Sequence, residues 1–309
     1  MATTDNVGEE MRALAWVLAL ALVACVSPTA PQATSGQPAS MADILAQSPA
    51  SDWRRLDPEQ TLYMDLPAGR VVIELSPDFS PQHTENVRAL ARANYWEGGV
   101  ITRVQDNYVT QWGRAEGDAH AMGAARADIA EPEYERPVGA LPFTRLADPD
   151  SYAPQTGFSN GFWAGRDGLG RTWMLHCYGA IGVGRDNPPN TGNGAELYVV
   201  IGQAPRHLDR NLAMVGRVVQ GMDLLTSLKR GTGPLGVYET AGERTPIRSI
   251  RLAADLPEAE RVNLEVLRTD SATFRAVIES RRFRRESFFV EPTGHINVCN
   301  VPLPVRPAR

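Results

Sequence analysis

The stretch from Gly99 to Gly113 constrains the fold of this chain more than any other. It holds two short runs of apolar and β-branched residues, joined at Gln105-Asp106-Asn107, where Asp and Asn favour a tight turn. The pattern predicts a β-hairpin. Arg103 and Gln111 lie on its opposite arms, each among apolar residues, so both can extend polar groups from one sheet face. We expect a rigid binding wall here.

Further β patterns lie on both sides of this hairpin. Strand-like runs at 62–66 and 70–75 flank a Pro-Ala-Gly turn, and apolar residues at helical spacing follow between 81 and 91. Downstream, 179–184 is a strand of small residues, as expected where a peptide backbone must approach a sheet closely. Alternating strand patterns of this density predict a mainly β domain.

Ordered blocks within these patterns resemble the cyclophilins, a family of peptidyl-prolyl isomerases. The matching segments are Ile101-Thr-Arg-Val104, Pro189-Asn-Thr191, Glu196-Leu-Tyr-Val-Val200, Leu208-Asp209 and the run from Gly216 to Asp223. Each block alone is a weak signal, but their common order along the chain is specific. The resemblance implies an eight-stranded closed β-barrel capped by two helices, with a small helical C-terminal extension.

The resemblance covers only part of the chain. We assign residues 59–253 to a cyclophilin-like domain and 254–309 to the C-terminal extension. Within the domain the match lapses over an insert at 114–173, which is rich in Gly, Pro, Asp and Arg. Because it lacks periodicity, we expect a functional or poorly ordered loop.

The C-terminal extension contains one helical pattern. Its apolar residues Phe274, Val277 and Ile278 predict a helix that starts after Thr269 or Asp270. Four arginines follow its end: Arg281, Arg282, Arg284 and Arg285. They suit a solvated helix C-terminus, and contact with anionic lipid is the alternative.

The N-terminal residues indicate export. Met11-Arg12 and the apolar run after them indicate a secretory signal, because the run is too short for a permanent transmembrane helix. The residues before Met11 are acidic where a signal should be basic, which suggests that translation starts at Met11. Leu22-Val-Ala-Cys25 resembles the bacterial lipobox, which implies a signal at 1–25 and a lipid on Cys25. A plain signal peptide cleaved nearby is the alternative. Residues 26–58 predict a disordered linker, because their composition buries little apolar surface. We therefore expect a periplasmic lipoprotein on a bacterial membrane.

Composition limits the other partners. A net charge of -5 gives no basic footprint, so nucleic acid is not expected. Neither a CxxC pair nor a His cluster occurs, and we expect no metal or cofactor. With Cys25 lipidated, Cys177 and Cys299 are left to form a disulfide in an oxidising compartment, or to stay as two free thiols. His176 adjoins Cys177 in a strand-like run, so the two side chains face apart and make no nucleophilic dyad.

By resemblance, Arg103 is the catalytic residue, and Gln111 assists it by binding the substrate backbone. The implied substrate-binding residues are Tyr108, Val109, Tyr198, His207, Leu208 and Leu212. Several rim residues depart from the usual family pattern, including Leu212 in place of His and Glu196 in place of Gln.

Two functions follow from this site. The first is a peptidyl-prolyl isomerase acting on proline peptides and unfolded proteins in the bacterial envelope. The second is a proline-peptide binding or scaffold module with little catalysis, which the altered rim favours. The alternative to a catalytic role for Arg103 is a structural one, in which the arginine only forms a salt bridge with a neighbouring residue.

Overall fold

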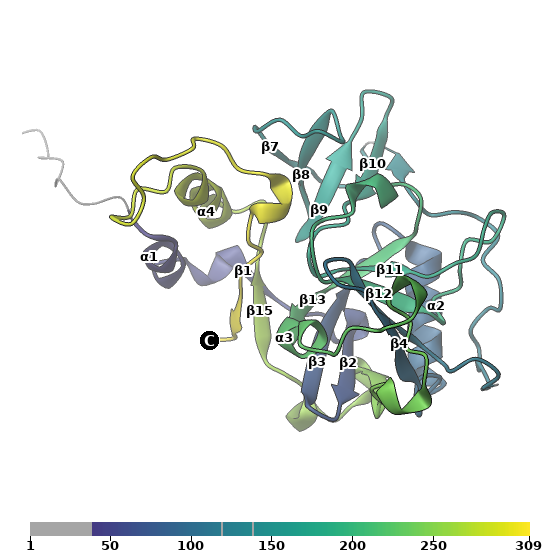
Figure 1. Cartoon of the computed structure of the whole chain (residues 1–309). Helices are drawn as coiled ribbons and strands as arrows, with labels where there is room; N and C mark the ends of the chain where they lie inside the picture. The colour runs from purple at the N-terminus through teal and green to yellow at the C-terminus, as the bar shows by residue number, and fades with distance from the viewer. Residues whose placement is uncertain (1–38, 119, 138) are drawn as a thin grey trace, which may run out of the picture. The chain divides into compact units, whose positions relative to one another are not determined.

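The structure is a computed structural model that describes residues 39–118, 120–137 and 139–309 (Figure 1). The expected signal at 1–25, the lipidation site Cys25 and the first part of the expected linker, 26–38, lie outside the described residues. Within the described part, no helix has both the length and the apolar character needed to cross a membrane.

An eight-stranded antiparallel sheet forms the centre of the domain. Its strands are β2 (Thr61–Leu66), β3 (Gly69–Leu75), β4 (Val100–Val104), β5 (Val109–Gly113), β11 (Ala180–Val183), β12 (Leu197–Val200), β13 (Met214–Gln220) and β14 (Ser249–Leu252). They are ordered β14-β2-β3-β13-β11-β12-β5-β4. This confirms the mainly β, eight-stranded prediction.

The two edges of this curled sheet meet over a short distance. Ile101 N donates to Thr245 O at 2.9 Å, and Ile247 N donates to Gly99 O at 2.8 Å. These bonds join β4 to the segment before β14. The contact is therefore a short bridge and not the full strand pairing of an ideal closed barrel.

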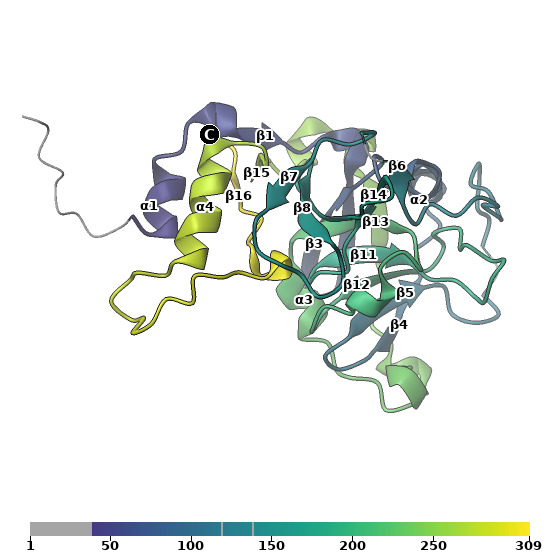
Figure 2. The same ribbon diagram turned by 90° about the horizontal axis from the view of Figure 1, so that it is seen from above.

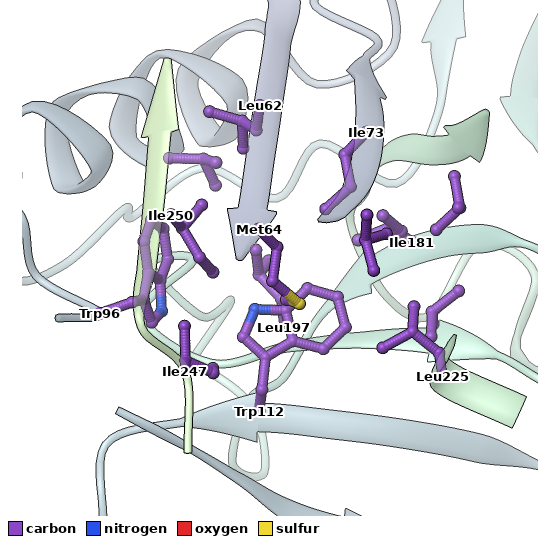
Figure 3. Close-up of a cluster of buried hydrophobic side chains, with 14 of the residues drawn as sticks. Leu62, Met64, Ile73, Trp96, Trp112, Ile181, Leu197, Leu225, Ile247 and Ile250 are labelled. Carbon is purple, nitrogen blue, oxygen red and sulfur yellow. The ribbon is translucent and has the colours of Figure 1, made fainter. Parts of the chain in front are cut away.

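The core lies inside the curl, where side chains from several strands meet (Figure 3). Trp112 of β5 and Trp96 are both fully buried in it. Helix α2 (Pro81–Arg92) adds Val87 and Leu90, and α3 (Met222–Thr226) adds Leu225. Burying Trp112 fixes the arm of the hairpin that carries Gln111, because an aromatic of this size contributes several kcal/mol to a core.

The insert folds into a second sheet, so the expectation of a loop is wrong. Its strands are β6 (Arg136–Pro137), β7 (Thr144–Leu146), β8 (Gln155–Ser159), β9 (Phe162–Arg166) and β10 (Arg171–Met174), in the order β6-β10-β9-β8-β7. Asn160 and Gly161, with φ of 49° and 94°, form the tight turn between β8 and β9. An Asn-Gly pair is a strong hairpin signal, but strands of two to five residues are too short to show periodicity.

The C-terminal extension is a mixed module that recruits residues from the N-terminal side. Strands β1 (Trp53–Arg55), β15 (Leu264–Leu267) and β16 (Val305–Pro307) form a sheet in the order β1-β15-β16. Helix α1 (Met41–Ala46) lies beside α4 (Ala272–Arg282) (Figure 2). The extension is thus not only helical.

Three sequence expectations for this module need correction. The predicted disordered linker is wrong for residues 41–55, because Trp53 is buried and its ring lies under the Arg306 guanidinium at 3.8 Å. Helix α4 starts after Ser271, whose hydroxyl accepts from Phe274 N at 3.0 Å, and not after Thr269 or Asp270. Arg282 at its end is not solvated, since it pairs with Asp148 of the insert.

A second core joins the insert, the extension and the outer face of the large sheet. Phe158 of β8 packs edge-on against Phe274 of α4, with ring centroids 4.8 Å apart. The structure also joins Cys177 and Cys299 in a disulfide with a Cα–Cα distance of 5.1 Å. The Pro-rich tail is therefore tied to the segment that follows β10.

Candidate active site

The hairpin of β4 and β5 carries the centre of the candidate site. Ile101 pairs with Trp112 and Arg103 pairs with Gln111, so Thr102 is an extra residue on β4. Such a bulge redirects the side chains that follow it, and here it sets Arg103 directly opposite Gln111. Asn107, at φ 52°, supplies the left-handed turn residue.

The guanidinium of Arg103 is held on three sides by neutral acceptors. Its Nε donates to the backbone oxygen of Leu235 at 2.6 Å, Nη1 donates to Gln111 Oε1 at 3.5 Å, and Nη2 donates to Gln105 Oε1. It also lies 5.5 Å from the ring centroid of Tyr108. Burial lowers the pKa of Arg103, and Tyr108 acts in the opposite direction, but an arginine still remains charged at physiological pH. In the part of the chain that the structure describes, all three acceptors are neutral, so Arg103 does not form the ion pair that was the alternative for it.

Gln111 links Arg103 to Glu196. Its Oε1 accepts from Arg103, and its Nε2 donates to Glu196 Oε2 at 2.8 Å. The two bonds need opposite ends of the amide, so they fix its orientation. In the sheet, Gln111 of β5 pairs with Tyr198 of β12, and both residues line the same cavity.

A cavity of about 490 Å³ opens beside these groups. It brings together seven of the predicted site residues: Arg103, Gln111, Tyr108, Val109, Tyr198, Leu208 and Leu212. The Tyr and aliphatic side chains form the apolar part of the cavity lining, and Tyr108 among them lies beside the Arg103 guanidinium. His207 is an exception, because it is exposed and does not line the cavity, although its neighbour Leu208 does. His207 and Leu208 are adjacent in the 3₁₀ turn Arg206–Leu208, and with three residues per turn adjacent side chains lie on different faces.

Sequence reasoning missed part of the wall. Gln105 and Leu235 bond to Arg103. Asp128, Arg185 and Asp186 also line the cavity. Leu235 lies far along the chain, and no local pattern points to its backbone oxygen. Asp186 and Arg185 directly follow the small-residue strand, which was the one available signal.

A family model described as "Cyclophilin type peptidyl-prolyl cis-trans isomerase/CLD" matches residues 61–253, more than half of the chain. The chain belongs to the cyclophilin family. This cyclophilin is 24% identical over 183 residues to a "Probable peptidyl-prolyl cis-trans isomerase" of Brucella suis biovar 1 (strain 1330), covering 57% of the chain and 74% of that relative. It is also 24% identical over 170 residues to "Peptidyl-prolyl cis-trans isomerase-like 3" of Mus musculus, covering 55% and 81%.

The fold has a counterpart among solved structures. The crystal structure of cyclophilin AquaCyp293 from Hirschia baltica matches with a TM-score of 0.66 and 24% identity, over 87% of this chain and 97% of that one. This coverage exceeds the segment matched by the family model. The structural likeness therefore includes some of this cyclophilin's residues beyond the family domain.

Proposed function

We propose that this cyclophilin accelerates cis-trans rotation of X-Pro bonds in proline peptides and unfolded proteins. The observation that carries the proposal is the Arg103 guanidinium, which neutral acceptors fix in the wall of a cavity that also holds Tyr and aliphatic side chains. Among the residues that the structure describes, no carboxylate pairs with this guanidinium, so we take its charge to be available to a substrate.

The reaction needs no covalent step. Rotation about an X-Pro bond has a barrier of roughly 18 to 20 kcal/mol, because the nitrogen lone pair is delocalised into the carbonyl. In the twisted state that lone pair localises on nitrogen, where an N–H group of Arg103 can donate to it. Because this bond is stronger in the twisted state than in either planar state, it lowers the barrier.

The remaining residues have binding roles. Three of the five N–H groups of Arg103 have partners among the described residues, which leaves donors on Nη1 and Nη2 for the substrate. The wall of Tyr108, Val109 and Leu208 suits a pyrrolidine ring. The amide of Gln111 suits the backbone next to it.

The test is a protease-coupled isomerisation assay with an Ala-Pro peptide on the wild type and Arg103→Ala. We expect the wild type to catalyse rotation and the variant to lose this activity, while its unfolding free energy, the control for folding, falls by less than about 1 kcal/mol. A wild type that binds the peptide without accelerating rotation would instead support the proline-peptide binding module. The observation that favours this module is the hydrogen bond between Gln111 and Glu196, a rim residue that departs from the usual family pattern.

We also propose that the protein is exported and held at a bacterial membrane through a lipid on Cys25. Support comes from the Leu22-Val-Ala-Cys25 motif and from the Cys177–Cys299 disulfide, since disulfides persist in oxidising compartments. Mass spectrometry of the membrane fraction should detect a lipidated N-terminal Cys25. An unmodified Cys25 would contradict this proposal.

A further inference from the structure

Five buried polar side chains form a continuous chain from the wall of the cavity into the insert. In order they are Tyr198, His176, Asp209, Arg206 and Asp150, and we call them the buried relay. Each is at most 7% exposed. Buried polar groups this numerous are stable only when every member is satisfied, and here each member bonds to the next.

The first half of the relay fixes the Tyr198 hydroxyl. His176 Nδ1 lies 2.9 Å from Asp209 Oδ1, and His176 Nε2 lies 2.8 Å from the Tyr198 hydroxyl. Because the Asp209 carboxylate only accepts, Nδ1 carries a proton, and Nε2 is the ring nitrogen that bonds to the Tyr198 hydroxyl. The strand partner of Tyr198 is Gly182, where a Cβ would collide with the hydroxyl. The ring therefore lies across a position that only glycine leaves open.

The second half reaches the insert. Arg206 Nε donates to Asp209 Oδ2 at 2.5 Å, and its two terminal nitrogens donate to the two oxygens of Asp150 at 2.9 and 3.0 Å. This bidentate pairing is the most directional ion pair available to arginine. Asp150 also accepts from Tyr152 N and Ala153 N, both at 2.9 Å, which anchors it in the connection between β7 and β8.

The relay touches the cavity at two places. Tyr198 lines the cavity directly. Leu208 lines it as well, and it lies in the chain between the relay members Arg206 and Asp209. The positions of both walls thus depend on the same set of bonds.

A nucleophilic role for Tyr198 does not fit this arrangement. Burial raises the pKa of Tyr198 well above its ordinary value, which disfavours the phenolate. The hydroxyl is directed at His176, while the ring borders the cavity. The geometry suits positioning and not chemistry.

We infer that the buried relay positions Tyr198 and Leu208 as walls of the proline cavity, so that the insert, through Asp150, determines how tightly substrate binds. The inference rests on the proposed function only in taking proline peptides as the ligand. The insert is then part of the binding apparatus and not a separate attachment.

The experiment measures the Kd of an Ala-Pro peptide and its bound-state exchange rate by NMR on the full chain. Two variants cut the relay at its ends: Tyr198→Phe removes one hydroxyl and keeps the ring, and Asp150→Asn removes the charge facing Arg206. We expect each to raise Kd about threefold to tenfold, the range for loss of one hydrogen bond, with the exchange rate within about twofold of wild type. The double variant should bind no more weakly than the weaker single variant, because one linked set is broken in both.

Asp148→Asn is the matched control. Asp148 lies in the same connection, is also buried, and accepts from Arg282 Nε at 3.0 Å, but its partner lies on α4 and not at the cavity. It should lose stability as Asp150→Asn does and leave Kd unchanged.

Three results would overturn the inference: an unchanged Kd in Tyr198→Phe, equal Kd values in Asp148→Asn and Asp150→Asn, or independent effects that multiply in the double variant. If Asp150→Asn does not fold, the Kd of Tyr198→Phe alone decides whether the inference stands. If the wild type binds the peptide without accelerating exchange, the proposed isomerase activity is contradicted. The Kd values of the variants would still test whether the buried relay positions the cavity walls.

Discussion

Two arginines, Arg103 at the cavity and Arg206 within the buried relay, show how the same side chain can have different roles. Arg103 is half-buried and bonds to neutral oxygens, whereas Arg206 is buried and bonds to two carboxylates. Burial lowers the pKa of Arg103. Burial acts in the same direction on Arg206, but Asp209 and Asp150 outweigh it and raise the pKa of Arg206. A guanidinium with uncompensated charge can act on a substrate, while one matched by carboxylates holds structure.

The largest effect is expected from Arg206→Ala. This change leaves Asp150 and Asp209 buried without their cation, and breaking a buried pair in this way costs about 3 to 5 kcal/mol. Urea unfolding should show this loss, whereas Arg103→Ala, measured in parallel, should lose less than about 1 kcal/mol. Equal losses in the two variants would remove the contrast between them.

The next effect concerns activity. Arg103→Lys keeps the charge but lacks the planar fork that bonds Leu235 and Gln105 while leaving donors for substrate. We expect kcat/KM to fall about 10-fold to 100-fold, which is less than the roughly 100-fold to 1,000-fold cost of losing a preorganised donor entirely, because the lysine keeps a charged donor. A lysine variant with wild-type turnover would show that a point charge is sufficient.

A smaller effect is expected from acid. Burial opposes ionisation of Asp150, but its bonds from Arg206 and Tyr152 N outweigh this and lower the pKa of Asp150. A carboxyl group with a depressed folded-state pKa contributes stability above its unfolded pKa of about 3.9, and this contribution is lost as pH falls through the folded value. Unfolding free energies between pH 5 and pH 3 should therefore fall more steeply in wild type than in Asp150→Asn. Parallel curves would contradict this.

The smallest effect is expected at the rim. Glu196→Gln keeps an acceptor for Gln111 but removes a negative charge from an exposed position. For a neutral proline peptide we expect kcat/KM to change less than about threefold, since exposed charges contribute little. A basic peptide should lose more than a neutral one at low salt, and the difference should vanish at high salt.

The large sheet and most of its site were predictable from sequence because their signals are local or ordered. The Asp-Asn turn, the alternating arms around Arg103 and Gln111, and the ordered blocks each depend on nearby residues. The bulge at Thr102 was not predictable, although it gives Arg103 its position. A one-residue shift in pairing leaves no mark on composition.

The insert and the relay were missed for a different reason. Strands such as Thr144–Leu146 are too short for a periodic pattern, and their stability comes from packing against residues far along the chain, such as Phe274. His176 was dismissed as a nucleophile beside Cys177, and no such dyad forms, but its bonds to Asp209 and Tyr198 join residues 33 and 22 positions away. Pairings over such separations depend on the fold.

The central claim is that Arg103 acts on the rotating bond and not on substrate affinity. NMR exchange spectroscopy of one Ala-Pro peptide with wild type and Arg103→Ala measures both quantities in the same sample. The account predicts that cis-trans exchange falls about 100-fold or more in the variant, while Kd changes less than about threefold. A variant in which Kd rises in proportion to the lost exchange, with bound peptide still rotating at the wild-type rate, would contradict it.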